Sequence, residues 1–167
     1  IESGKLQLER RTVDLRTVVA ETIETRRAQI ERRRQRLTIE LGAEALWLDA
    51  DPVRLAQVVS NLVDNAAKYT PKDGHISVKM WCVDDHAVVE VRDTGIGIPR
   101  ERMQSIFQPF TQLHASRESS PGGLGLGLTL VRSLTELHGG TVKVVSRGAG
   151  QGTSFTCLLY TSHAADD

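Results

Sequence analysis

Two adjoining runs of alternating apolar and polar residues constrain the fold of this chain more than any other feature. The first covers residues 75–83 and the second residues 87–92, and Asp84, Asp85 and His86 join them. Alternation with a period of two is typical of half-buried β-strands, and so short a polar connection predicts an antiparallel hairpin. The chain is therefore expected to build a sheet with one buried face.

Helical periodicity surrounds this hairpin. Apolar residues recur every three to four positions in residues 14–34, 52–69 and 124–138. Asp14 can cap the first helix, and Asp51 followed by Pro52 is a typical cap and first position for the second. Gly139 and Gly140 end the third. Each of these segments is expected to form a helix with one apolar face.

Shorter alternating segments predict further strands. They cover residues 5–9, 37–41, 46–48, 142–145 and 153–160. Strands and helices in this order are typical of an α+β two-layer α/β sandwich, in which helices lie on one face of a sheet. We expect a mixed, mostly antiparallel sheet covered on one face by about three helices.

Composition narrows the class of protein. The 167 residues are 40% hydrophobic, which suits one compact domain. Lys plus Arg number 21 and Asp plus Glu number 21, so we expect no nucleic-acid partner and no membrane contact. No apolar run is long enough for a membrane span. Cys82 and Cys157 lie in strand-like runs without metal-binding spacing, which favours buried free thiols over a disulfide or metal site and suits an intracellular compartment.

Polar side chains share one line on the second expected helix. Asn61, Asn65 and Lys68 are spaced i, i+4 and i+7, apart from the apolar stripe of that helix. Asparagine is a mediocre residue for the middle of a helix, so a binding face and an ordinary solvated face both remain open. The arginines at the end of the first helix are interspersed with glutamates, and we interpret them as a solvated face.

Two glycine-containing segments can approach a ligand with their backbone. Residues 93–99 place Asp93 at a strand end beside Gly95 and Gly97, although a plain β-turn uses the same residues. Residues 122–128 alternate glycine and leucine at a helix start, where unpaired N–H groups suit phosphates. The P-loop, the dinucleotide-binding G-x-G-x-x-G spacing and the protein-kinase motifs are all missing from the sequence.

Five segments in order carry a family resemblance. They are residues 59–70, 93–99, 106–110, 123–128 and 150–155. The chain resembles the ATP-binding catalytic domain of two-component sensor histidine kinases, with the segments matching the N box, G1 box, F box, G2 box and final G-x-G-T-x-F strand entry. The match runs from about Ser3 to Leu159, nearly the whole chain. The ordered set is specific, and it implies the fold expected above.

The resemblance implies roles for the second helix. Asn65 would give its amide oxygen to Mg²⁺, which prefers hard oxygen ligands. Asn61 would face the phosphates, and Lys68 would neutralise part of their charge. Tyr69 would pack near the nucleotide, unless it is a core aromatic. Related gyrase-type ATPases resemble this chain but place a water-activating glutamate where Asn61 stands, and an amide cannot act as that base.

The resemblance also implies the adenine and phosphate contacts. Asp93 would accept a hydrogen bond from the adenine amino group, so ATP should be preferred over GTP. Thr153 would add a hydroxyl near the base. Arg117, in a segment expected to be a lid, would contact the γ-phosphate unless it is simply solvated. The remaining ATP-binding residues are expected to be Gly95, Gly97, Ile98, Phe110, Gly123, Leu124, Gly125, Leu126, Gly127 and Leu128.

The implied function is ATP-dependent phosphorylation of a histidine, with Asn61, Lys68 and Arg117 closest to the chemistry. Residues 1–8 would end an upstream dimerisation and phosphoacceptor segment, residues 9–161 would form the catalytic domain, and residues 162–167 would be a tail of undetermined origin. The expected partners are those upstream helices, within a homodimer of the full-length protein, and the receiver domain of a response regulator. This domain is expected in the cytoplasm, whether or not the full-length protein is anchored in a membrane. The alternatives are another ATPase or a non-enzymatic nucleotide-switch module of the same superfamily.

Overall fold

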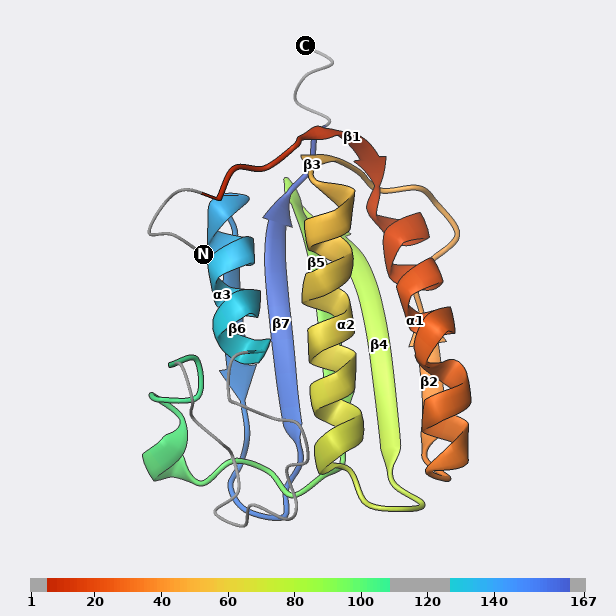
Figure 1. Ribbon diagram of the computed structural model, residues 1–167, viewed down its shortest axis with the longest axis vertical. Helices are drawn as coiled ribbons and strands as arrows, with labels where there is room; N and C mark the ends of the chain where they lie inside the picture. Colours follow the sequence, from red (N-terminus) through yellow and green to blue (C-terminus); the bar gives the residue numbers. More distant parts are fainter. Residues whose placement is uncertain (1–5, 109–126, 163–167) are drawn as a thin grey trace.

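A computed structural model describes residues 6–108 and 127–162, and these form two layers (Figure 1). One layer is a five-stranded sheet in the order β2-β4-β5-β7-β6. Its strands are β2 (Arg36–Glu40), β4 (His75–Val83), β5 (His86–Asp93), β6 (Thr141–Val145) and β7 (Thr153–Tyr160). The other layer consists of α1 (Leu15–Arg32), α2 (Pro52–Tyr69) and α3 (Gly127–Leu137), side by side on one face of the sheet. The expected α+β sandwich is confirmed.

The sheet is mostly antiparallel, as its alternating sequence predicts. Strands β4 and β5 form the predicted hairpin, with Val78 opposite Val91 and Met80 opposite Val89. All four side chains are buried against the helices. Only β2 and β4 run parallel within this sheet. The hairpin therefore lies at the centre of the molecule, and its buried apolar side chains form the part of the core that the sheet contributes.

Helix α2 begins and ends where the sequence predicts. Oδ1 of Asp51 accepts hydrogen bonds from the backbone N–H groups of Val53 and Arg54, at 3.0 and 3.2 Å. Because this cap satisfies donors that have no partner inside the helix, it fixes the start at Pro52. The buried stripe of α2 consists of Leu55, Val58, Val59, Leu62, Val63, Ala66 and Ala67. Helices α1 and α3 flank α2 on opposite sides (Figure 1).

The first and third predicted strands need correction. Residues 6–9 form no strand; instead β1 (Arg11–Asp14) pairs antiparallel with β3 (Trp47–Ala50) in a separate two-stranded sheet. Val13 lies opposite Leu48, and both side chains are buried. Residues 46–48 are predicted as an edge strand, and the strand that forms here pairs with β1 and not with the five-stranded sheet. Burial of this apolar pair accounts for the alternative pairing.

The cysteines also differ from expectation at one position. Cys157 on β7 is buried, as predicted, and its burial raises the pKa of the thiol to about 12. Cys82 is exposed, because β4 continues at that end beyond its run of buried residues. Among the described helices, none combines the length and the apolar character that crossing a membrane requires.

Candidate functional site

The end of α2 touches the loop that follows β5. The backbone N–H of Ile96 donates to the carbonyl oxygen of Tyr69 at 3.1 Å. A Cβ atom at Gly95 would lie less than 3.0 Å from that same oxygen, a separation that real side chains essentially never show. Glycine at position 95 therefore lets the two backbones meet, and this contact joins two of the motifs found in the sequence.

The loop between β6 and β7 closes on the same place. Gly97 has a φ of +74°, and a Cβ atom there would lie less than 3.0 Å from the carbonyl oxygen of Gly148. A Cβ atom at Gly152 would lie equally close to the carbonyl oxygen of Asp93. Because the backbones of three segments meet closely at these glycines, the glycines have a structural role in addition to any contact with a ligand.

Asp93 is the buried charge of this region. It lies at the end of β5, its side chain is on the helix-covered face, and the residue is 5% exposed. Burial raises the pKa of its carboxyl group to about 6, although hydrogen bonds from the backbone N–H groups of Gly95 and Thr153 partly oppose that rise. The bond from Gly95 measures 2.8 Å. A buried carboxylate with so few partners is a candidate recognition group.

Helix α2 connects this region to the start of α3. Nδ2 of Asn61 donates to the carbonyl oxygen of Gly127 at 3.3 Å. At the other end, Nζ of Lys68 lies 5.4 Å from the centre of the Tyr69 ring. The helical rise of 1.5 Å per residue puts about 12 Å between positions 61 and 69. The face of α2 thus forms a strip that suits an elongated ligand.

The middle of this strip carries Asn65, half-buried on the same face as Asn61 and Lys68. Within residues 6–108 and 127–162, the side chains of Asn65 and Lys68 make no hydrogen bond or ion pair. The described residues also contain no group of three His, Cys, Asp or Glu side chains that could hold a metal ion. The amide oxygen of Asn65 is a single ligand and would hold a metal ion weakly by itself. It therefore suits a hard cation whose other ligands are oxygens of water or of a bound ligand.

The structure brings together a large part of the predicted site. Asn61, Asn65, Lys68, Tyr69, Asp93, Gly95, Gly97, Thr153 and Gly127 lie along α2, at its two ends, or in the segments packed there. Ile98 and Leu128 are buried in the core. Phe110, Arg117, Gly123, Leu124, Gly125 and Leu126 lie outside the described residues.

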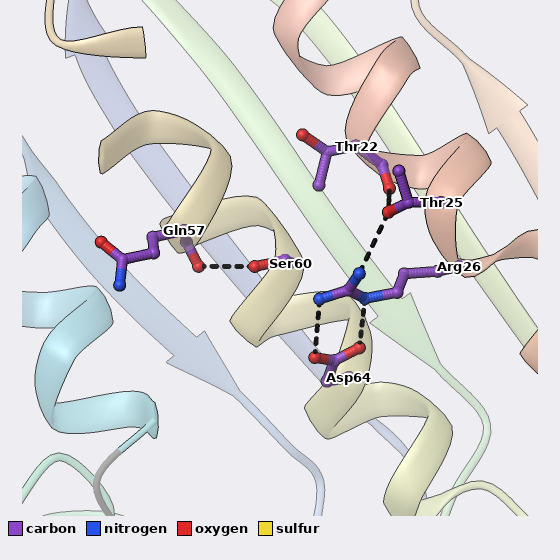
Figure 2. Close-up of polar contacts among 6 residues, drawn as sticks. All are labelled: Thr22, Thr25, Arg26, Gln57, Ser60 and Asp64. Atoms are coloured by element: carbon purple, nitrogen blue, oxygen red, sulfur yellow. Dashed lines mark hydrogen bonds and ion pairs between the residues drawn. The ribbon is translucent and has the colours of Figure 1, made fainter. Parts of the chain in front are cut away.

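The sequence does not predict one contact of Arg26. Arg26 of α1 pairs with Asp64, which lies on α2 between Asn61 and Asn65 (Figure 2). The basic run that includes Arg26 was interpreted as a solvated face, which holds for most of its members. No pattern in the sequence signals this pair, because its members are 38 residues apart.

Comparison with known families gives a match over most of the chain. Residues 50–162 match the family described as histidine kinase-, DNA gyrase B-, and HSP90-like ATPase. This segment includes α2, the loop after β5 and the entry to β7, and so it contains the whole described site. The same segment also contains the six predicted site residues that lie outside the described structure.

Individual proteins are similar over almost the whole chain. The circadian input-output histidine kinase CikA of Synechococcus elongatus is 39% identical over 161 residues, which are 95% of this chain and 21% of that kinase. The catalytic domain of histidine kinase ThkA superposes with a TM-score of 0.80 at 27% identity, covering 92% of this chain and 96% of that one. Full-length ShkA in complex with AMPPNP has a TM-score of 0.80 at 25% identity, covering 95% of this chain and 32% of that one. The chain thus spans about a fifth of CikA.

Proposed function

Because this chain belongs to the histidine kinase-, DNA gyrase B- and HSP90-like ATPase family, in the form of the ATP-binding domain of sensor histidine kinases, we propose that it binds Mg-ATP along α2. The adenine would lie between Asp93 and Thr153, and the phosphates would extend toward Asn61 and the start of α3. The buried carboxylate of Asp93, placed where α2 ends, is the observation that carries this proposal.

Asp93 would select the base. Its ionised carboxylate can only accept hydrogen bonds, and the amino group of adenine is a donor. Guanine carries a carbonyl oxygen at the equivalent position, so two acceptors would face each other in a site with little water. Because Asp93 is 5% exposed, water cannot readily relieve that mismatch. The site should therefore prefer ATP over GTP.

The polar face of α2 would hold the phosphates and the metal. Asn65 would contribute an amide oxygen to Mg²⁺, and phosphate oxygens and water would complete its shell. When bound, Mg²⁺ would neutralise phosphate charge. Asn61, which contacts Gly127, would donate its N–H to a phosphate oxygen, and Lys68 would add a positive charge. Asn61 cannot act as a base for water at neutral pH, which limits ATP hydrolysis.

The acceptor of the phosphoryl group would come from elsewhere in the protein. We propose that the γ-phosphoryl group passes to a histidine on upstream dimerisation helices, and then to the receiver domain of a response regulator. In this arrangement residues 1–8 lead from those helices, residues 9–161 form the catalytic domain, and residues 162–167 form a tail. Arg117 would reach the γ-phosphate. The whole protein would work as a homodimer, with this domain in the cytoplasm.

The proposal is tested by binding and transfer with the 167-residue chain. Titration calorimetry with Mg²⁺ should show saturable binding of ATP and much weaker binding of GTP. Mixing the chain with labelled ATP and the histidine-bearing helices of its parent protein should then put acid-labile phosphate on those helices. Equal affinity for ATP and GTP would contradict the role of Asp93. Binding without transfer would leave a nucleotide-switch module as the better description.

A further inference from the structure

An ion pair between α1 and α2 holds the Asp64 carboxylate beside the polar face of α2, which consists of Asn61, Asn65 and Lys68. Nε of Arg26 lies 2.7 Å from Oδ1 of Asp64, and Nη2 of Arg26 donates to Oδ2 of Asp64 at 3.2 Å (Figure 2). The third guanidinium nitrogen, Nη1, donates to Oγ1 of Thr25 at 3.0 Å. That hydroxyl in turn donates to the carbonyl oxygen of Thr22 at 2.6 Å. The guanidinium plane is therefore held on every nitrogen, and it holds the carboxylate in one orientation.

The position of Asp64 makes its orientation matter. With 3.6 residues per turn, Asp64 lies about 60° around α2 from Asn61 and about 40° from Lys68. Figure 2 shows its carboxylate turned toward α1. The hydroxyl of Ser60, one turn earlier, donates instead to the carbonyl oxygen of Gln57 at 3.1 Å. Among the described residues, Arg26 is thus the partner of the Asp64 carboxylate.

A contribution to folding stability does not by itself explain this ion pair. The side chains of Arg26 and Asp64 are 30% and 45% exposed, so water and salt screen their attraction and reduce what even a pair with two hydrogen bonds adds to folding. Apolar packing already attaches α1 to the molecule, since Val19, Ile23 and Ile30 are at most 1% exposed. A free carboxylate beside Asn61 and Lys68, however, would repel a polyphosphate and would compete for Lys68.

We propose that Arg26 is a positioning residue for the nucleotide. Arg26 would neutralise Asp64 and hold its carboxylate on the α1 side of the phosphate face, which is the face of α2 that carries Asn61, Asn65 and Lys68. The inference rests on the proposed function, because it concerns the same phosphate face. Among the described residues, the polar contacts of Arg26 are with Asp64 and Thr25, and neither belongs to the Asn61, Asn65 and Lys68 face. Its effect passes through a charge, so it should grow with the charge of the ligand and disappear when Asp64 is made neutral.

The test compares three variants of the 167-residue chain by titration calorimetry with Mg²⁺. Arg26→Gln should weaken ATP binding about fivefold and ADP binding less, because charge repulsion near a surface is modest and scales with ligand charge. The double variant Arg26→Gln/Asp64→Asn should regain an affinity close to that of the unmodified chain. Arg27→Gln is the matched control, because Arg27 is the next residue of α1 and pairs with Glu24 of the same helix at 2.8 Å.

Each result decides the inference. Greater loss for ATP than for ADP, with recovery in the double variant, supports it. Unchanged ATP affinity in Arg26→Gln overturns it, as does equal loss in the double variant, which would show that Arg26 only fastens α1 to α2. If the unmodified chain binds no ATP, the proposed function fails and this inference fails with it. If the unmodified chain binds ATP and Arg26→Gln matches it, this inference alone fails.

Discussion

The two ends of the site are built in opposite ways. Around Asp93, backbone atoms of three segments interlock at Gly95, Gly97 and Gly152, and no side chain larger than hydrogen fits at those positions. Along the middle of α2, Asn65 and Lys68 are half-buried and form no hydrogen bond or ion pair with the described residues. The first region is thus held together by close backbone contacts, whereas the second presents polar groups that have no hydrogen bond or ion pair within residues 6–108 and 127–162.

This difference predicts how each region contributes to stability and to ligand binding. The interlocked region keeps the Asp93 carboxylate out of water, and this burial raises the pKa of the group because the charged form is disfavoured there. A ligand that donates a hydrogen bond to Asp93 relieves part of this cost of burial. The polar side chains of α2 are half-buried, so their affinity for a ligand must come from the charge of the ligand and metal. We expect substitutions in the first region to alter stability and those in the second to alter binding alone.

Gly97→Ala should give the largest effect. The substitution adds a Cβ atom less than 3.0 Å from the Gly148 carbonyl oxygen, at a φ of +74° that alanine rarely adopts. We expect the free energy of unfolding to fall by about 3 kcal/mol. Urea denaturation monitored by circular dichroism measures it.

The control for that prediction is Gly42→Ala. Gly42 also has a φ of +74°, but nothing lies within 4 Å of a Cβ atom placed there. It should lose only about 1 kcal/mol, the cost of the backbone conformation. Equal losses at both positions would show that the contact between the two loops contributes nothing.

Asp93→Asn should act on binding and stability in opposite directions. Loss of the charged acceptor should weaken ATP binding about thirtyfold and reduce discrimination against GTP. At pH 7 the neutral amide avoids the burial of charge, so the free energy of unfolding should rise by about 1 kcal/mol. Calorimetry and urea denaturation measure the two quantities, and exposed Asp49→Asn serves as the control. A fall in both quantities would mean that Asp93 is mainly structural.

Asn65→Ala should affect binding only. Loss of the amide oxygen should lower ATP affinity about tenfold with Mg²⁺ present and change it little in EDTA. The free energy of unfolding should stay within about 0.5 kcal/mol, because Asn65 is half-buried and alanine favours helix. Gln57→Ala, earlier on the same helix, is the matched control and should leave the Mg²⁺ dependence intact. If the affinities with and without Mg²⁺ fell together, Asn65 would not be a metal ligand.

The pH dependence of Asp93 should give the smallest effect. The folded-state pKa of about 6 lies above the unfolded value, so the contribution of Asp93 to stability is fully present below about pH 4 and is lost as the pH rises through 6. Binding needs the ionised form and therefore runs the other way, falling about fourfold from pH 7.5 to 5.5. Asp93→Asn corrects for protonation of ATP itself. A difference between the two proteins that does not vary with pH would contradict the raised pKa.

Local signals in the sequence were enough for much of the fold and for part of the site. Asp51 and Pro52 place the start of α2, and alternation places the hairpin. These elements depend on hydrogen bonds and periodicities within a few residues. The pairing of β1 with β3 was not predicted, because alternation near residue 7 resembled a strand equally well. Burial of Val13 against Leu48, 35 residues apart, decides that pairing.

For the site, the sequence by itself determined that one helix would present Asn61, Asn65 and Lys68 together and that Asp93 would end a strand. Only the tertiary structure decided that Tyr69 meets Gly95, that Gly97 meets Gly148, and that Arg26 holds Asp64. The reason is physical. Helical and strand periodicity acts over a few residues, whereas these contacts depend on strand order and on which helix lies beside α2, and those follow from burying the whole core at once.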